Sequence, residues 1–119
     1  MILLDANYIL RFLLKDNLEM YEISKECIAN NQCKVLSEVF AEVVFVLLKV
    51  YNIDRIEIKD TLQSFVGFDN IIIDNKSDIV KALEIFESKK LDFVDAILCA
   101  KSNKYHIKTF DKKLIKCMS

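Results

Sequence analysis

The sequence predicts an α/β fold: a three-layer α/β/α sandwich around a central parallel sheet of four or five short strands. Short continuous apolar runs, typical of strands buried on both faces, alternate with longer helical segments. No proline, linker or repeat interrupts this alternation. The chain of 119 residues has the length of one domain, so we expect a single domain over residues 1–119.

Four apolar runs predict the strands. Each is short, and each is followed within a few residues by a helical segment, as in a sheet whose strands are connected by helices. The predicted strands are residues 2–4, 33–36, 70–74 and 106–110.

The segments between these runs have helical character. The segment 38–50 is ambiguous, because Val43–Val46 favours a strand whereas the length of the segment favours a helix. Gly67, the only glycine, closes the helix before the third strand. The predicted helices are residues 7–14, 18–30, 38–50, 53–66, 78–88, 92–100 and 112–116.

Composition excludes some classes of protein. Hydrophobic residues make up 53% and charged residues 29% of the chain, and the formal net charge is −1. This is not the basic profile of a protein held to nucleic acid mainly by its own charge, although bound cations could supply the positive charge. No apolar run approaches the ~20 residues of a membrane span, and the apolar start is too short for a signal peptide. We therefore expect a cytoplasmic protein without membrane contact.

The cysteines show no metal-binding pattern. Cys27, Cys33, Cys99 and Cys117 form no Cys-x-x-Cys pair, and the only histidine, His106, has no cysteine at zinc-like spacing. We predict that all four are reduced thiols.

Two carboxylates open the predicted helix 92–100. Asp92 and Asp95 are three residues apart, so they lie on one face of a helix. The rest of the segment is apolar nearly all round, which is typical of a buried helix. The pair suggests a cation site, but an Asp at the N-cap with an acid three residues later also resembles a capping box.

Other acids are predicted at the same edge of the sheet. Asp5 ends the first strand and Asp111 ends the fourth, although each could simply cap the following helix. On the helix 38–50, Glu38, Glu42 and Lys49 form one polar line, which is the exposed edge of the helix or a carboxylate row facing a cleft. Their periodicity favours the exposed edge. Ligands of open α/β sheets bind at the carboxyl ends of the strands, so we expect these acids to converge.

Such a cluster would need a cation. Two like charges ~4 Å apart repel by about 4 kcal/mol at an effective dielectric constant near 20. Either the pKa values of some carboxyls rise or a hard cation such as Mg²⁺ or Mn²⁺ binds. This chemistry points to metal-assisted hydrolysis of a phosphodiester.

The chain resembles the PIN-domain nucleases, and most closely the VapC-type ribonuclease toxins of prokaryotic toxin–antitoxin pairs. Four segments carry the resemblance, in the family's order and with similar spacing, and together they span almost the whole chain. Each segment alone is weakly specific, whereas the ordered set is strong. The segments are Leu3–Leu10, Ser37–Val43, Asp92–Leu98 and Thr109–Leu114.

The resemblance implies an acidic quartet of Asp5, Glu42, Asp95 and Asp111, with Asp92 as an accessory acid. It selects Glu42 over Glu38, which periodicity could not do. It implies that Asn7 and Thr109 support the acids by hydrogen bonding. It also implies Mg²⁺- or Mn²⁺-dependent cleavage of single-stranded RNA, a homodimer and inhibition by a cognate antitoxin. The family usually continues to a final edge strand after the last acid, and we expect that strand to be absent here.

Basic and aromatic residues near the acids have two interpretations each. Five cations flank Asp5 and Asp111 and could contact phosphate, but solvated helix faces are the better interpretation; they are Arg11, Lys15, Lys112, Lys113 and Lys116. Tyr8 and Phe93 could stack on a base, but core packing is favoured.

Two rival hypotheses remain. The chain could be a catalytically silent PIN-like module that binds a partner. It could also be a phosphoryl-handling α/β domain, but Asp74 is poorly placed for a receiver domain. A dehalogenase-type phosphatase needs a second Asp where Asn7 stands. The acids therefore favour a metal-dependent endoribonuclease.

Overall fold

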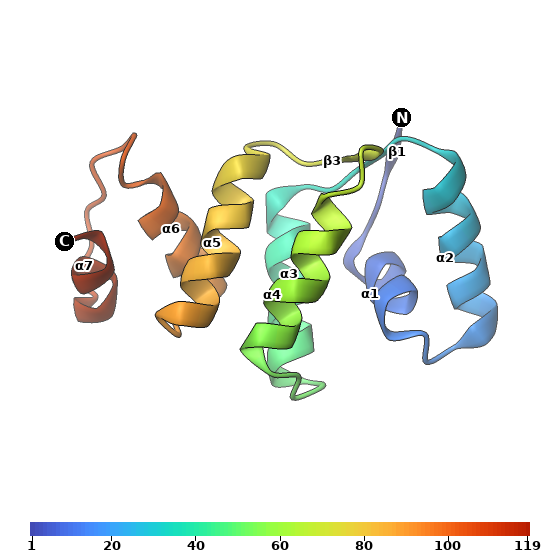
Figure 1. The fold of residues 1–119 in the computed structure, drawn as a ribbon, viewed down its shortest axis with the longest axis horizontal. Helices are drawn as coiled ribbons and strands as arrows, with labels where there is room; N and C mark the ends of the chain where they lie inside the picture. Colours follow the sequence, from blue (N-terminus) through green and yellow to red (C-terminus); the bar gives the residue numbers. More distant parts are fainter.

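The computed structural model describes all residues 1–119 and contains seven helices and three strands. No helix combines the length and hydrophobicity that crossing a membrane requires. Figure 1 shows the order of the elements along the chain. They are β1 (Ile2–Leu3), α1 (Ala6–Leu14), α2 (Leu18–Asn30), β2 (Cys33–Lys34), α3 (Ser37–Lys49), α4 (Arg55–Val66), β3 (Ile71–Ile72), α5 (Lys76–Ser88), α6 (Phe93–Lys101) and α7 (Lys112–Met118).

The sheet is parallel, with the strand order β1-β2-β3. Ile2 pairs with Cys33, and Cys33 pairs with Ile71. Each strand has only two residues. The predicted α/β fold with a parallel sheet is confirmed, but the sheet is smaller than predicted and most of the chain is helical.

The helices lie in a row, with α1 and α2 at one end and α6 and α7 at the other (Figure 1). The molecule is flat, with principal extents of 45 × 30 × 18 Å. Helix α3 packs against α1 and also against α6, so it lies between the two helices whose first residues follow Asp5 and Asp92. The prediction of a helix over 38–50 is confirmed.

Aromatic side chains fix the start of α6 in the core. The Phe93 ring lies 5.6 Å from the Phe40 ring of α3 and 6.1 Å from the Phe86 ring of α5, measured between centroids. All three are buried. Core packing of Phe93 is therefore confirmed, and it places the residues around Asp95 between α3 and α5.

The prediction of a fourth strand over 106–110 is not confirmed. These residues have no regular secondary structure, and Phe110 is fully exposed. Helix α7 packs against α6 at the end of the row, so the preceding segment runs beside α6 and away from β1 (Figure 1). One edge of β1 therefore remains unpaired, and Leu3 is 60% exposed.

The prediction of four reduced thiols is wrong for one pair. Cys99 of α6 and Cys117 of α7 form a disulfide, with Cα atoms 6.2 Å apart. Cys27 and Cys33 are free. The sequence pattern gave no sign of the pairing, because the two cysteines are 18 residues apart and meet only when α7 packs on α6.

Four turns use residues other than glycine in the left-handed region. Lys15, Asn52, Asn75 and Lys90 have φ between 53° and 57°. The only glycine, Gly67, has an ordinary φ of −73° at the end of α4.

Candidate active site

Among the predicted site acids, Asp95 has a pKa that is clearly shifted, and the shift is upward. It lies in the first turn of α6 and is half-buried. Burial raises the pKa of its carboxyl, and the negative charges of Asp111 and then Asp92 raise it further. The structure therefore brings three of the predicted acids, from α6 and the start of α7, within electrostatic range of one another.

Arg55, the first residue of α4, holds the chain that leads into α6. Its Nη1 donates to the carbonyl oxygens of Phe86 (2.8 Å) and Leu91 (2.7 Å). Its guanidinium also lies 4.4 Å from the centre of the Phe86 ring. Burial lowers the pKa of Arg55, and the charge of Asp92 opposes that shift. Arg55 thus fixes the backbone directly before the carboxylates.

Asp111 is the N-cap of α7. Its Oδ1 accepts a hydrogen bond from the Leu114 amide (2.9 Å), while its own amide donates to Thr109 Oγ1 (3.0 Å). Thr109 therefore orients the turn that carries Asp111. One carboxylate oxygen serves as a cap, and the acid as a whole is exposed.

Asp5 and Glu42 lie on other elements. Asp5 is the N-cap of α1, and its Oδ1 accepts from the Tyr8 amide (2.8 Å). Glu42 is exposed in the second turn of α3. Asn7 is exposed in the first turn of α1. Glu42 therefore stands on the helix that contacts both α1 and α6, whereas Asp5 caps a helix on the other side of α3 (Figure 1).

The predicted ligands are all carboxylates, which is the type of ligand that a hard cation prefers, but they do not form a preformed metal site. No group of three or more His, Cys, Asp or Glu side chains converges closely enough to hold a metal ion. Carboxylate oxygens are the donors that Mg²⁺ and Mn²⁺ prefer, and Mg²⁺ needs only one or two of them besides waters and substrate oxygens. Burial raises the pKa of Asp95, and the charges of Asp111 and Asp92 raise it further; a divalent cation would offset the repulsion among these three acids.

A hollow of about 360 Å³ opens beside Asp92 and Asp95, between α3 and α6. Its walls are mainly apolar and include Phe45 and Val94, which are 60% and 59% exposed. Lys49 lies at the same hollow. Sequence reasoning missed this feature; the nearly continuous apolar surface of the segment 38–50 was the signal that one face of α3 would remain uncovered.

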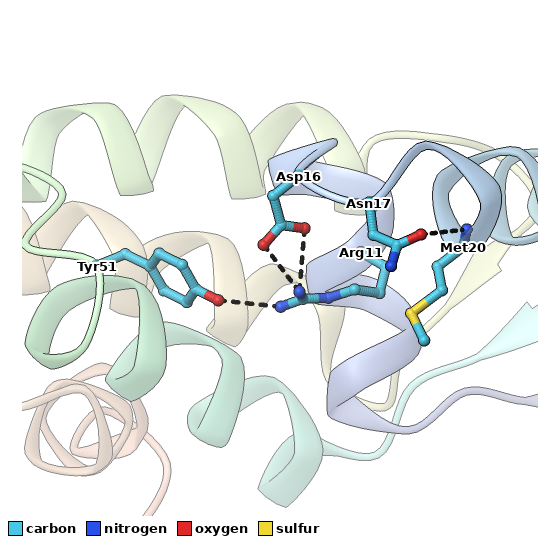
Figure 2. A network of polar contacts seen from close by, with 5 residues as sticks. All are labelled: Arg11, Asp16, Asn17, Met20 and Tyr51. Carbon is cyan, nitrogen blue, oxygen red and sulfur yellow. Dashed lines mark hydrogen bonds and ion pairs between the residues drawn. The ribbon is translucent and has the colours of Figure 1, made fainter.

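The predicted phosphate-binding cations behave differently from one another. Arg11 Nη1 donates to both carboxylate oxygens of Asp16 (3.0 and 2.8 Å), and its Nη2 donates to Tyr51 Oη (3.2 Å), as Figure 2 shows. Arg11 thus joins α1 to the turn before α2 and to the end of α3. The ammonium of Lys15 lies 5.4 Å from the centre of the Tyr21 ring.

Three further lysines of the predicted set, all on α7, are exposed. They are Lys112, Lys113 and Lys116.

Sequence reasoning also missed a buried ion pair. Asp78 in the first turn of α5 is 5% exposed, and its Oδ2 lies 3.2 Å from Lys101 Nζ and 3.3 Å from Lys104 Nζ. Burial alone would raise the pKa of Asp78, but the hydrogen bonds from the two lysines hold it below its usual value. No local pattern predicted this contact, because it joins the start of α5 to the end of α6.

Comparison with known protein families gives one finding. The PIN domain family model matches residues 2–117. Neither the curated proteins nor the solved structures give a match. PIN domains are generally nucleases, and they typically use divalent metal ions. Because the match spans nearly the whole sequence, the chain belongs to the PIN domain family.

Proposed function

We propose that the protein is a metal-dependent endoribonuclease that hydrolyses phosphodiester bonds of single-stranded RNA. One observation carries the proposal: burial and two neighbouring carboxylates raise the pKa of Asp95 in a PIN domain. Perturbed acids of this kind concentrate at functional sites. The net charge of −1 also fits an enzyme that relies on a cation to approach a polyanion.

Within this proposal the acids have distinct roles. Asp5 and Asp95 would be the primary ligands of Mg²⁺ or Mn²⁺, and Glu42 and Asp111 would complete the pocket. Asp92 would be an accessory acid beside Asp95. When held there, such an ion would supply Lewis-acid polarisation of a phosphoryl oxygen and a nucleophilic water near neutral pH. Arg55 keeps the start of α6 in place through the Phe86 and Leu91 carbonyls.

The biological setting is also part of the proposal. Similarity to the VapC-type toxins supports the role of a toxin in a toxin–antitoxin pair, with a cognate antitoxin, a homodimer and a cytoplasmic location. Light scattering of the purified protein tests the dimer, and co-purification with the product of a neighbouring small reading frame tests the antitoxin.

The decisive experiment measures cleavage of an unstructured RNA in the presence of Mg²⁺ or Mn²⁺. Asp95→Asn and Asp5→Asn should each lower the rate by at least ~100-fold while the circular dichroism spectrum is unchanged. Asp69→Asn is the matched control, because Asp69 is exposed and lies outside the predicted site. Full activity in both Asp95→Asn and Asp5→Asn would refute the assignment.

A catalytically silent binding module is the second candidate. It is favoured by the capping hydrogen bonds of Asp5 and Asp111 and by the absence of three converging ligands. Failure of the wild-type protein to cleave any of a panel of structured and unstructured RNAs with either metal would support this candidate.

A further inference from the structure

The Cys99–Cys117 disulfide joins the two helices that carry the carboxylates of the candidate site. Cys99 lies four residues after Asp95, one turn further along α6. Cys117 lies on α7, which Asp111 caps. The bond is thus a covalent link between Asp95's helix and Asp111's helix.

Besides this link, few contacts hold α7; one is a hydrogen bond from Lys113 Nζ to the Lys90 carbonyl (3.4 Å). The helix has seven residues, its only buried side chain is Leu114, and α6 is the helix against which it packs. The segment 102–111 that connects the two helices has no regular secondary structure apart from turns. Opening of the disulfide would therefore loosen α7, and Asp111 with it.

The two sulfurs differ in their access to solvent. Cys99 is 6% exposed in the core side of α6, whereas Cys117 is half-buried and lines an open hollow of about 350 Å³. Attack on a disulfide requires access to one sulfur along the S–S direction. Cys117 is therefore the more accessible of the two cysteines, and it is the one that lines an opening to solvent.

The hollow at Cys117 is basic. Lys89 from the end of α5 and Lys113 and Lys116 from α7 line it, and no carboxylate does. Lys113 lies one turn before Cys117 on the same helix. Nearby ammonium groups stabilise a thiolate and attract anions, so this environment suits a small thiol that carries carboxylates.

We propose that Cys117 is a thiol–disulfide exchange site for small anionic thiols, and that exchange there controls how α7 is held against α6. The consequence for catalysis rests on the proposed function, whereas the exchange itself does not.

The exchange balances with two thiols. The thiolate of the first attacks Cys117 Sγ, a mixed disulfide forms, and the bond to Cys99 breaks. The electron pair leaves on Cys99 Sγ, which takes a proton from water. A second thiolate then attacks the sulfur of the bound molecule, releasing a small-molecule disulfide and the Cys117 thiolate. The protein gains two electrons and the two thiols lose them; a small-molecule disulfide drives the reverse.

The chemical test uses glutathione, which is anionic, and cysteamine, which is cationic, on full-length protein with Cys27 replaced by serine. The measured quantity is the rate of reduction by glutathione divided by the rate of reduction by cysteamine. At low salt this ratio should be about tenfold larger for the protein than for an unstructured peptide disulfide. Lys113→Gln/Lys116→Gln and high salt should each remove this preference. No preference, or one that survives both changes, would overturn the basic exchange site.

The site of attack is tested with single variants in the same background. With oxidised glutathione, Cys99→Ser should form a mixed disulfide at Cys117, detected by intact mass, whereas Cys117→Ser should react at Cys99 at least about tenfold more slowly. Equal rates at the two positions would show that access does not select Cys117. If either variant fails to fold, peptide mapping of the mixed disulfide trapped on the protein that retains both cysteines shows whether glutathione is attached to Cys117 or to Cys99.

Hydrogen exchange separates this inference from the nuclease proposal. On reduction, amides of residues 112–118 should exchange at least about tenfold faster, and Cys99→Ser/Cys117→Ser should match the reduced protein. If the amides of α7 exchange at the same rate in the oxidised and reduced protein, the disulfide does not control how α7 is held against α6. If RNA is cleaved, the oxidised form should be the more active one, and the double serine variant should not respond to redox state. Absence of cleavage would refute the proposed function while leaving the exchange results valid.

Discussion

The pKa values of two carboxyl groups, Asp95 and Asp78, are shifted in opposite directions, and the structure gives the cause of each shift. Burial and two neighbouring carboxylates raise the pKa of Asp95, so its ionised form is disfavoured; burial also acts on Asp78, but the hydrogen bonds from Lys101 and Lys104 outweigh it and lower the pKa of Asp78. The first arrangement lowers stability and is useful for binding a cation. The second stabilises the packing of α5 on α6.

Replacement of Asp95 should therefore stabilise the protein. Because the folded-state pKa of Asp95 is raised, the ionised carboxylate costs stability at pH 7, and this cost disappears as the pH falls below the unfolded value of 3.8. Asp95→Asn should raise the free energy of unfolding by up to about 1 kcal/mol at pH 7, measured with urea, and by less near pH 3. Millimolar Mg²⁺ should stabilise the wild type but not the variant; a variant less stable than wild type at pH 7 would contradict the repulsion.

Asp78→Asn should have the opposite effect. The folded-state pKa of Asp78 is lowered, so its contribution is present above the unfolded value of 3.8 and is lost as the pH falls through the folded value. The variant should lose about 2 kcal/mol at pH 7 and progressively less in acid. Asp74→Asn, which removes an exposed pair with Lys34, is the control and should change stability by less than about 0.5 kcal/mol.

Between elements, the important contacts join segments that are distant in the sequence. Arg55 connects the start of α4 to the turn between α5 and α6, and the rings of Phe40 and Phe86 enclose Phe93. Helix α6 therefore begins at a rigid point even though no side chain of its own caps it. This rigidity is what a site built on the first turn of α6 requires.

Substitution of Arg55 should make the start of α6 less rigid. Arg55→Lys keeps the charge but loses the planar guanidinium that lies over the Phe86 ring and holds Nη1 between the Phe86 and Leu91 carbonyls. We expect a loss of about 2 kcal/mol in the free energy of unfolding and faster hydrogen exchange at the amides of residues 92–96. An exchange pattern like that of the wild type would show that the Phe93 cluster alone fixes the start of α6.

Apolar periodicity was sufficient for most elements. Continuous apolar runs located β1, β2 and β3, and segment length resolved the ambiguity of α3. The run at residues 106–110 misled us, because strand formation also depends on a neighbouring edge, and α7 packs with α6 away from β1.

For the candidate site, sequence spacing located Asp92 and Asp95 on one turn. It could not reveal the Asp78 ion pair, the disulfide or the contacts of Arg55, since all of them depend on how the helices pack.

At the scale of the whole molecule, the helices form a flat row with a very small sheet at one edge (Figure 1). The proposed ligands are consequently divided: Asp92, Asp95 and Asp111 belong to one end of the row, and Asp5 belongs to α1 beyond α3. Glu42, on α3, lies between them. A divalent cation bound at the α6 end would interact first with the acids of α6 and α7.

Four turns adopt the left-handed conformation with a residue other than glycine, and this choice affects the conformational entropy of the unfolded chain. Side chains at these turns restrict the conformations of the unfolded chain, so folding loses less entropy there than it would with glycine. Against this, a left-handed residue with a Cβ costs about 1–2 kcal/mol in the folded state. At the exposed Lys90, with φ of 56°, we expect the second effect to prevail. Lys90→Gly should then stabilise the protein by about 0.5 kcal/mol in urea unfolding, and a loss of stability would show that the ordering of the unfolded chain dominates at this turn.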